Sequence, residues 1–400
     1  MAKKKPIKLN DQQLMLDASR VADIYHQMTI DLFDQVVDRV RERGTASLED
    51  NPYIWQLEKM SEMGLLNKDN IKLIAEYSGV AEEQLRYVIE NEGYKIYKDT
   101  KSQLLEALGG NGDFITNNLI QKNLANYVNQ TTGDIDNLIN TTLPKSVRKV
   151  YQGIVEETVA KVITGLATPE KAISSTVIKW AEKGFYGFTD KGGKQWRADA
   201  YARTVINSTS WRVYREARMA PAKELGIDTF YYSMKPAARE MCAPIQHQIV
   251  TFGETRVEEG EKIYSLLDYG YGSAGGCLGI NCHHTLTPYV VGVNYKPDLP
   301  EHLANLTPEE AIENANKQSK QRAIERSIRQ SKEMLHIANK LEDEELINKY
   351  KGQVKSRQAA MRAYLSQNPF LHRDYSRERY YSDPLREAKA EIKLRKTERW

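Results

Sequence analysis

A helical repeat of apolar residues runs through most of the first 225 positions and restricts this part of the chain to an almost wholly α-helical fold. After Asn10 and Asp11, apolar residues recur every three or four positions and predict an amphipathic helix that ends at Gly44. Its apolar positions are Val21, Ile24, Tyr25, Met28, Leu32, Val36 and Val40. A short basic arm precedes this helix.

The same repeat predicts further helices at 54–63, 71–77, 82–91, 114–129, 143–165, 168–183 and 196–225. Glycine-rich loops are expected at Gly109–Asp113 and at 184–193. The second and third of these helices flank a turn at Ser78-Gly79-Val80 and have the form of a helix-turn-helix. The helix after this turn carries more acidic than basic residues, which disfavours DNA reading because phosphate contacts need lysine or arginine.

The pattern changes at residue 228, where short runs of aromatic and β-branched residues predict strands. Strands are expected at Asp228–Met234, Gln248–Phe252 and Thr285–Val290, with a glycine-rich loop before the last of them. Residues 226–295 therefore form a small α+β module attached to a helical body.

The chain beyond residue 300 is predicted to be helical and highly charged. Thr307-Pro308-Glu309-Glu310 supplies a cap, a proline at the first helical position and acid in the first turn, as Thr168-Pro169-Glu170 does earlier. The apolar stripe up to about residue 365 is thin, so we expect this helix to project from the body or to lie against a partner. The tail at 370–400 mixes arginine and lysine with tyrosine and is expected to be an extended, interaction-prone end.

The fold class is thus mainly α with a small α+β module. We expect four regions: a helical N-terminal docking region at 1–165, an α+β core at 166–295, a charged helical region at 296–366 and a basic-aromatic tail at 367–400.

Composition excludes several classes of protein. The 57 lysine and arginine residues nearly balance the 54 aspartate and glutamate residues, so global charge does not indicate a nucleic-acid binder. No apolar run approaches the ~18 residues of a membrane span, and the N-terminus has no signal-peptide pattern, so synthesis in a cytoplasm is expected. Three clustered cysteines fit reduced thiols better than a disulfide framework.

All three cysteines and three of the seven histidines lie in two short segments, 234–247 and 277–289. Cys242 with His247, and Cys282 with His284, would make a Cys2His2 zinc set, with Cys277 and His283 as spares. The Cys-x-His spacing is poor for a standard zinc knuckle. The other interpretation is a small thiol-rich core whose histidines are hydrogen-bonded, and the residues leave zinc binding open.

Catalytic schemes fit these segments less well. No nucleophile elbow or oxyanion signature surrounds Cys242 or Cys282. A metal-dependent nuclease could use Cys242, His247, Cys282, His283 and His284, but paired Cys-x2-Cys knuckles are missing. Gly270-Tyr-Gly-Ser-Ala-Gly275 satisfies Gly-x-Gly-x-x-Gly, yet no helix is predicted after it, so it indicates a loop or close backbone packing.

The order of these motifs resembles a known family. Met-Lys-Pro-Ala-Ala-Arg-x-x-Cys242-x-x-x-Gln246, a glycine-rich loop and Gly-Ile-Asn-Cys282-His-His-x-x-x-Pro-Tyr289 are similar to the core of tailed-bacteriophage minor capsid proteins, the head-morphogenesis proteins related to the F protein of phage Mu. Arg203-Thr-x-x-Asn207 resembles the helix that precedes this core. The resemblance covers about residues 10–295 and departs from the family pattern at His247 and His283, where glycine and arginine are common.

The resemblance implies a virion protein present in few copies, made in the host cytoplasm and located inside the head near the portal vertex. Its implied partners are the portal protein and the major capsid or scaffold protein, with no membrane, and the resemblance allows for ejection of the protein with DNA. The basic-aromatic tail adds packaged double-stranded DNA as an expected partner. The resemblance implies no enzymatic activity, no cofactor and no catalytic or metal residues. Cys242, Gln246, Cys282 and His284 are then residues that fold a small clasp, and the metal-dependent nuclease is the alternative.

Overall fold

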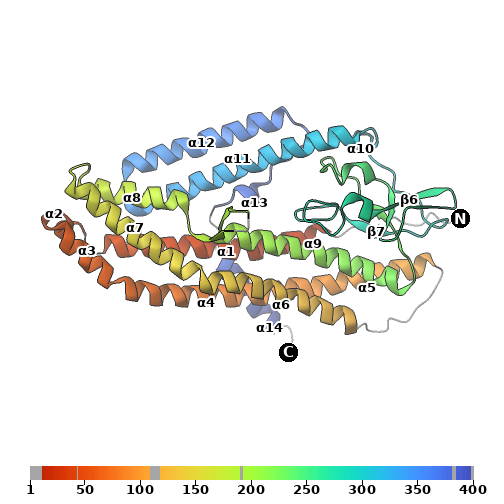
Figure 1. Ribbon diagram of the computed structural model, residues 1–400, viewed down its shortest axis with the longest axis horizontal. Helices are drawn as coiled ribbons and strands as arrows, with labels where there is room; N and C mark the ends of the chain where they lie inside the picture. The colour runs from red at the N-terminus through yellow and green to blue at the C-terminus, as the bar shows by residue number, and fades with distance from the viewer. Residues whose placement is uncertain (1–10, 43, 109–117, 190–191, 381–383, 398–400) are drawn as a thin grey trace. The chain divides into compact units, whose positions relative to one another are not determined.

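The computed structural model of the protein describes residues 11–42, 44–108, 118–189, 192–380 and 384–397 (Figure 1). The predicted basic arm at the N-terminus and the predicted loop at Gly109–Asp113 lie outside these residues. The chain divides into two compact units. Unit 1 comprises Met1–Ser19, Leu85–Thr131 and Thr204–Lys320, and unit 2 comprises Arg20–Gln84, Thr132–Arg203 and Gln321–Trp400. Each unit is described separately below.

Helices make up most of the described chain, as the sequence predicted. They are α1 (Asp11–Arg41), α2 (Ala46–Asp50), α3 (Pro52–Ser61), α4 (Met63–Tyr87), the π-helical turn η1 (Val88–Glu92), α5 (Gly93–Ala107), α6 (Asn118–Thr141), α7 (Leu143–Ile163), α8 (Pro169–Lys183), α9 (Ala198–Glu224), α10 (Glu301–Ala304), α11 (Pro308–Leu341), α12 (Glu344–Ser366), α13 (Tyr375–Glu378) and α14 (Pro384–Thr397). The prediction of a mainly α fold with a small α+β module is confirmed.

The predicted helix-turn-helix is wrong, because α4 continues through Ser78 and Gly79. Buried Ile74, Tyr77 and Ala81 keep one helical face apolar across this point. A hypothetical side chain at Gly79 would meet nothing within 4 Å, so this glycine faces open space. Its helix-interior penalty of about 1 kcal/mol is smaller than the benefit of the continuous buried face.

In unit 2, α7 and α8 pack closely, and Gly153 makes this possible. A Cβ atom at Gly153 would lie 2.2 Å from Cζ2 of Trp180, so only glycine allows the indole to lie against the α7 backbone. Buried Tyr151 and Ile154 continue the same core along α7.

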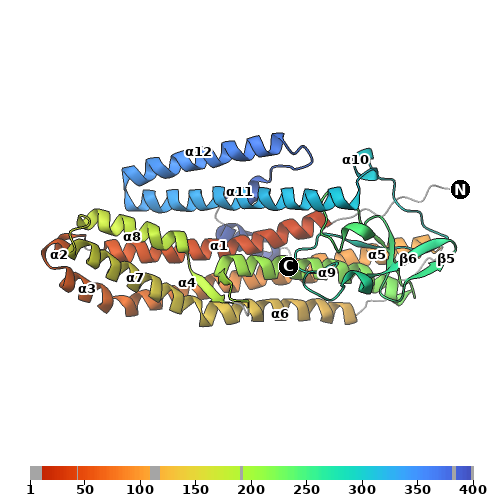
Figure 2. The same ribbon diagram turned by 45° about the horizontal axis from the view of Figure 1, so that its top comes forward.

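From Gln321 onward the charged C-terminal helices pack within unit 2, which corrects the expectation that this region projects from the body. Arg357 of α12 donates to the carbonyl of Ser327 of α11 at 2.6 Å, and the two helices run side by side in Figures 1 and 2. Lys340 of α11 pairs with Asp38 of α1 at 2.9 Å. Polar contacts therefore compensate for the thin apolar stripe of α11.

The described part of the tail is helical, which differs from the predicted extended end. It forms α13 and α14, and α14 buries Ala388 and Ile392. Lys389 pairs with Glu76 of α4, and Lys396 lies 2.8 Å from Glu83 of the same helix. The acidic surface of α4 holds this basic helix.

Unit 1 contains a five-stranded sheet in the order β5-β6-β4-β3-β7. Its strands are β3 (Thr229–Tyr232), β4 (Ile249–Thr251), β5 (Arg256–Glu258), β6 (Glu261–Ser265) and β7 (Leu286–Pro288). β4 and β6 are parallel, and the other neighbours are antiparallel. The predicted strands at 228–234, 248–252 and 285–290 correspond to β3, β4 and β7.

Side chains of β3 alternate between two apolar clusters. Phe230 and Tyr232 enter the larger cluster, which also contains the three cysteines, whereas Tyr231 packs with Ile249 and Ile263 in the smaller one. Because both faces of β3 are buried, this central strand was readily recognised from its aromatic residues.

Two hairpins were missed by the sequence analysis. β5 and β6 meet at Glu259 and Gly260, which both have positive φ, at 48° and 82°. These strands contain charged residues and lack the runs of aromatic and β-branched residues from which strands were predicted. The other hairpin, β1 (Tyr186–Thr189) with β2 (Gln195–Arg197), lies in unit 2, where a turn-rich loop at 184–193 and a helix from residue 196 were expected.

Candidate functional site

The structure brings together three of the predicted ligand residues in unit 1. Cys242 ends the turn before the 3-10 helix η2 (Ala243–Ile245), and Cys282 and His284 immediately precede β7. The Sγ atoms of Cys242 and Cys282 are 3.8 Å apart, and Sγ of Cys282 lies 3.4 Å from Nδ1 of His284. The three donor atoms all lie within 4.8 Å of one another. We call this group the Cys2His cluster.

Gln246 fixes the orientation of the histidine in this cluster. Its Oε1 lies 2.8 Å from Nε2 of His284 and also accepts a hydrogen bond from the backbone N–H of Lys235 at 2.7 Å. An amide oxygen only accepts, so Nε2 carries the proton in this arrangement. The unprotonated Nδ1 of His284 then faces the thiol of Cys282.

The remaining predicted ligands lie elsewhere. His247 turns away with φ of 58°, and its Nδ1 is 3.0 Å from the Tyr231 hydroxyl. The ring of His283 packs against Trp211 at a centroid distance of 5.1 Å. Cys277 lies in the same apolar core and directs its thiol to the carbonyl of Leu266 at 3.4 Å. The predicted pairing of Cys242 with His247 is therefore wrong.

The glycine-rich segment forms a tightly packed turn that leads to Cys282. A Cβ atom at Gly276 would lie 1.8 Å from the carbonyl oxygen of Gly270, so the backbone approach excludes any larger residue. Leu278 and Asn281 adopt positive φ of 56° and 59°. This conformation is costly for leucine. The prediction of close backbone packing, with no dinucleotide-binding helix, is confirmed.

Burial and mutual contact polarise the two thiols. Cys242, Cys282 and His284 are each less than 5% exposed. The contact with Cys242 lowers the pKa of Cys282, whereas the contact with Cys282 and burial raise the pKa of Cys242. Burial raises the pKa of Cys277 to about 12. Thiolate is the form in which cysteine binds metal.

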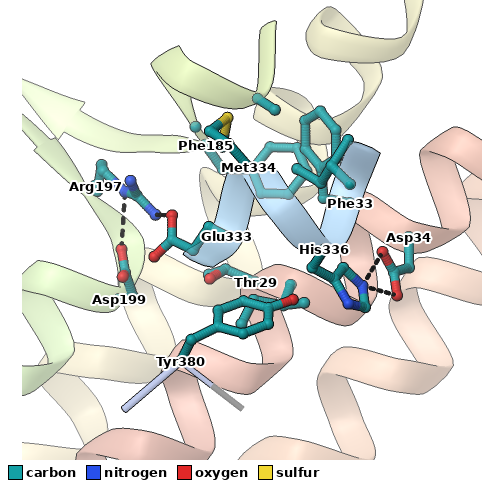
Figure 3. A pocket seen from close by; sticks show the side chains of 14 residues that line it. Thr29, Phe33, Asp34, Phe185, Arg197, Asp199, Glu333, Met334, His336 and Tyr380 are labelled. Carbon is teal, nitrogen blue, oxygen red and sulfur yellow. Dashed lines mark hydrogen bonds and ion pairs between the residues drawn. The ribbon is translucent and has the colours of Figure 1, made fainter. Parts of the chain in front are cut away.

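Unit 2 contains a second polar group, which the sequence analysis missed. Nε of Arg197 lies 3.2 Å from Asp199, and Nη2 lies 3.4 Å from Glu333 (Figure 3). His26 bridges the same two carboxylates, 2.9 Å from Asp199 and 3.5 Å from Glu333. The sequence feature that could have indicated this group is His26, a histidine among the apolar positions of the predicted first helix.

The cavity beside this group is too small for a substrate. Its volume is about 30 Å³, and its wall includes His336, which lies 2.9 Å from Asp34 (Figure 3). That space suits about one water molecule. The group therefore joins α1, α9 and α11 through charge pairs inside unit 2. Arg203, from the motif that resembled the family helix, similarly pairs with Asp23.

No helix in the described part of the chain has the length and apolarity to cross a membrane.

Comparison with known proteins gives a consistent result. The family described as phage minor capsid protein 2 matches residues 9–366. A protein named structural protein from Lactococcus phage LL-H is 31% identical over 370 residues, which cover 89% of this chain and 98% of the relative. A structural protein of Lactococcus phage mv4 is 36% identical over 118 residues, or 30% of this chain and 92% of the relative. No solved structure matches.

The family match changes one expectation. The resemblance was placed at about residues 10–295, but the match runs to residue 366 and so includes the whole of α11 and α12.

Proposed function

The chain belongs to the phage minor capsid protein 2 family and is a structural protein of a phage virion, and we propose that it binds the portal protein inside the procapsid and supports head assembly without catalysis. We infer from the family description, a minor capsid protein, that the chain is present in few copies. An icosahedral shell repeats each of its ordinary surfaces many times, whereas the portal vertex occurs once. A low copy number is therefore best explained by attachment at that vertex.

The observation that carries this proposal is an exposed apolar face on α3. Tyr53, Ile54 and Leu57 lie on one side of this helix and are 64%, 50% and 71% exposed. We call these three residues the α3 apolar face. Large apolar side chains grouped on a surface are typical of protein interaction sites. The face lies within residues 1–165, the region expected to dock on the portal or capsid.

Co-purification with an isolated portal ring tests this assignment. The double variant Ile54→Glu/Leu57→Glu should bind the ring at least ~10-fold more weakly, equivalent to about 1.4 kcal/mol. Val257→Glu is the matched control, because Val257 is 70% exposed but lies on β5 outside this region. Equal binding by both variants, or binding of the wild-type chain to major capsid protein and not to the ring, would overturn the proposal.

Contact with packaged DNA through residues 367–400 stays a weaker prediction. Lys389 and Lys396 are paired with glutamates of α4, and Arg373 is paired with Glu378 at 2.7 Å, so part of the basic charge is already compensated. DNA binding by the tail would weaken steeply with salt and would decrease when residues 370–400 are removed.

The nuclease alternative receives no support from the site. Cys242, Cys282 and His284 are buried, and His247 and His283 lie outside their cluster. A phosphodiester must reach the metal that activates its attacking water, which a closed cluster does not allow.

A further inference from the structure

We propose that Cys242, Cys282 and His284 bind one structural zinc ion. The inference goes beyond the assembly function and does not depend on it.

The spacing of the donor atoms matches the edges of a tetrahedral zinc site. With Zn–S of about 2.3 Å and Zn–N of about 2.0 Å, tetrahedral angles place two sulfur ligands about 3.8 Å apart and sulfur and nitrogen about 3.5 Å apart. The corresponding distances are 3.8 Å between Cys242 and Cys282 and 3.4 Å between Cys282 and His284. Two of the three donor–donor distances therefore match a tetrahedral site, and the third pair of donor atoms lies within 4.8 Å.

The surroundings of His284 support the same assignment. A metal-bound histidine usually donates its other ring N–H to a carbonyl or carboxylate oxygen, which orients the ring. Gln246 supplies such an oxygen at 2.8 Å from Nε2, and the Lys235 N–H holds that oxygen in place. Nδ1 then carries a lone pair that faces Cys282 and can bind a metal ion.

The ligands would join two separate loops of unit 1. Cys242 comes from the segment before η2 and the other two come from the segment before β7, forty positions further along the sequence. The Tyr232 hydroxyl lies 4.0 Å from Sγ of Cys282. Because all three ligands are buried, the ion would be closed off from substrates and would act as a cross-link.

Metal analysis of the full chain tests the site. The protein should be expressed with zinc, purified without an affinity tag under reducing and anaerobic conditions, and analysed by mass spectrometry for bound metal. We expect about one zinc per chain in the wild type. Cys242→Ser and His284→Gln should lose it. Cys277→Ser is the matched control, because Cys277 is equally buried in the same core but is not a ligand, and it should retain the ion.

A second readout does not depend on whether the variants fold. Wild-type protein stripped with a chelator and given Co²⁺ should develop the visible absorption of tetrahedral cobalt and a thiolate-to-cobalt charge-transfer band. Three results would overturn the proposal: a folded wild type that takes up neither Zn²⁺ nor Co²⁺, equal metal loss in the Cys277→Ser and Cys242→Ser proteins, or a Cys242–Cys282 disulfide in the anaerobically purified chain.

Discussion

Oε1 of Gln246 accepts a hydrogen bond from Nε2 of His284 at 2.8 Å, and this contact joins the segment after Cys242 to the segment that enters β7. The same oxygen accepts from Lys235, so a single buried amide group satisfies two donors from different parts of the chain. Gln246 is thus the polar centre of the α+β module, whether or not an ion is bound beside it.

Replacing Gln246 with alanine should lower the free energy of unfolding by about 1–3 kcal/mol, because two buried donors lose their acceptor. Urea unfolding followed by circular dichroism measures this change. Gln248→Ala is the control two positions away. Its side chain is only half-buried, so the expected change is within about 0.5 kcal/mol. Similar losses in both variants would show that Gln246 has no special role.

The two Thr-Pro-Glu helix starts should respond differently to removal of the threonine hydroxyl. Thr307 Oγ1 accepts from the N–H of Glu310 at 3.2 Å, and Glu310 accepts from the N–H of Thr307 at 2.9 Å, which completes a capping box. The hydroxyl of Thr168 makes no cap hydrogen bond. Thr307→Ala should therefore cost about 1 kcal/mol of unfolding free energy.

Thr168→Ala serves as the comparison, with an expected cost well below that of Thr307→Ala. Thermal or urea unfolding of the two variants side by side gives the difference. A larger loss at Thr168 would contradict the assignment of the capping box.

These two helix starts show what local sequence rules could predict. The rules placed the start of both helices correctly, since proline at the first turn and acid after it act within a few residues. They could not show which threonine hydroxyl reaches a backbone N–H. They also failed at Gly79, where packing along the buried face of α4 outweighs the preference of glycine for a turn.

The candidate site in unit 1 shows the same limit of local sequence rules. The sequence identified Cys242, Cys282 and His284 as candidates because thiols and imidazoles are rare in this chain. It paired Cys242 with His247 on spacing alone, whereas the positive φ of His247 turns that ring toward Tyr231. Cys242 and His284 come together because β3 pairs with β7. Pairing between strands that are distant in the sequence cannot be predicted from the spacing of neighbouring residues.

His283 should be dispensable for metal binding by the chain. Its ring lies against Trp211 and outside the Cys2His cluster, so His283→Ala should retain wild-type metal content and should lose only packing energy.

Incubation of the wild type with DNA and Mg²⁺, Mn²⁺ or Zn²⁺ should yield no cleavage. Cleavage that disappears in both His283→Ala and His284→Ala would restore the nuclease alternative.

Asp199 should be one of the most stabilising carboxylates of unit 2. It accepts from His26 at 2.9 Å and pairs with Arg197 at 3.2 Å. Asp199→Asn leaves these groups without their anion, so unfolding free energy should fall by about 3–5 kcal/mol. The matched control is Asp38→Asn, because Asp38 pairs with Lys340 on the surface and its loss should cost about 0–1 kcal/mol. Urea unfolding at neutral pH compares the two.

The contribution of Asp199 should also disappear in acid, in a direction set by its pKa. Burial alone would raise the pKa of this carboxyl, but the Arg197 guanidinium and the hydrogen bond from His26 hold it well below the usual value. Below about pH 4 the unfolded chain binds a proton at Asp199 that the folded chain does not, so stability falls as pH decreases toward the folded-state pKa. The stability difference between wild type and Asp199→Asn should therefore be full at about pH 5 and shrink by up to about 1.4 kcal/mol for each pH unit below about 4. Urea unfolding of both proteins across this range measures it, and a difference that stays constant down to about pH 3 would show that the carboxyl titrates normally in the folded chain.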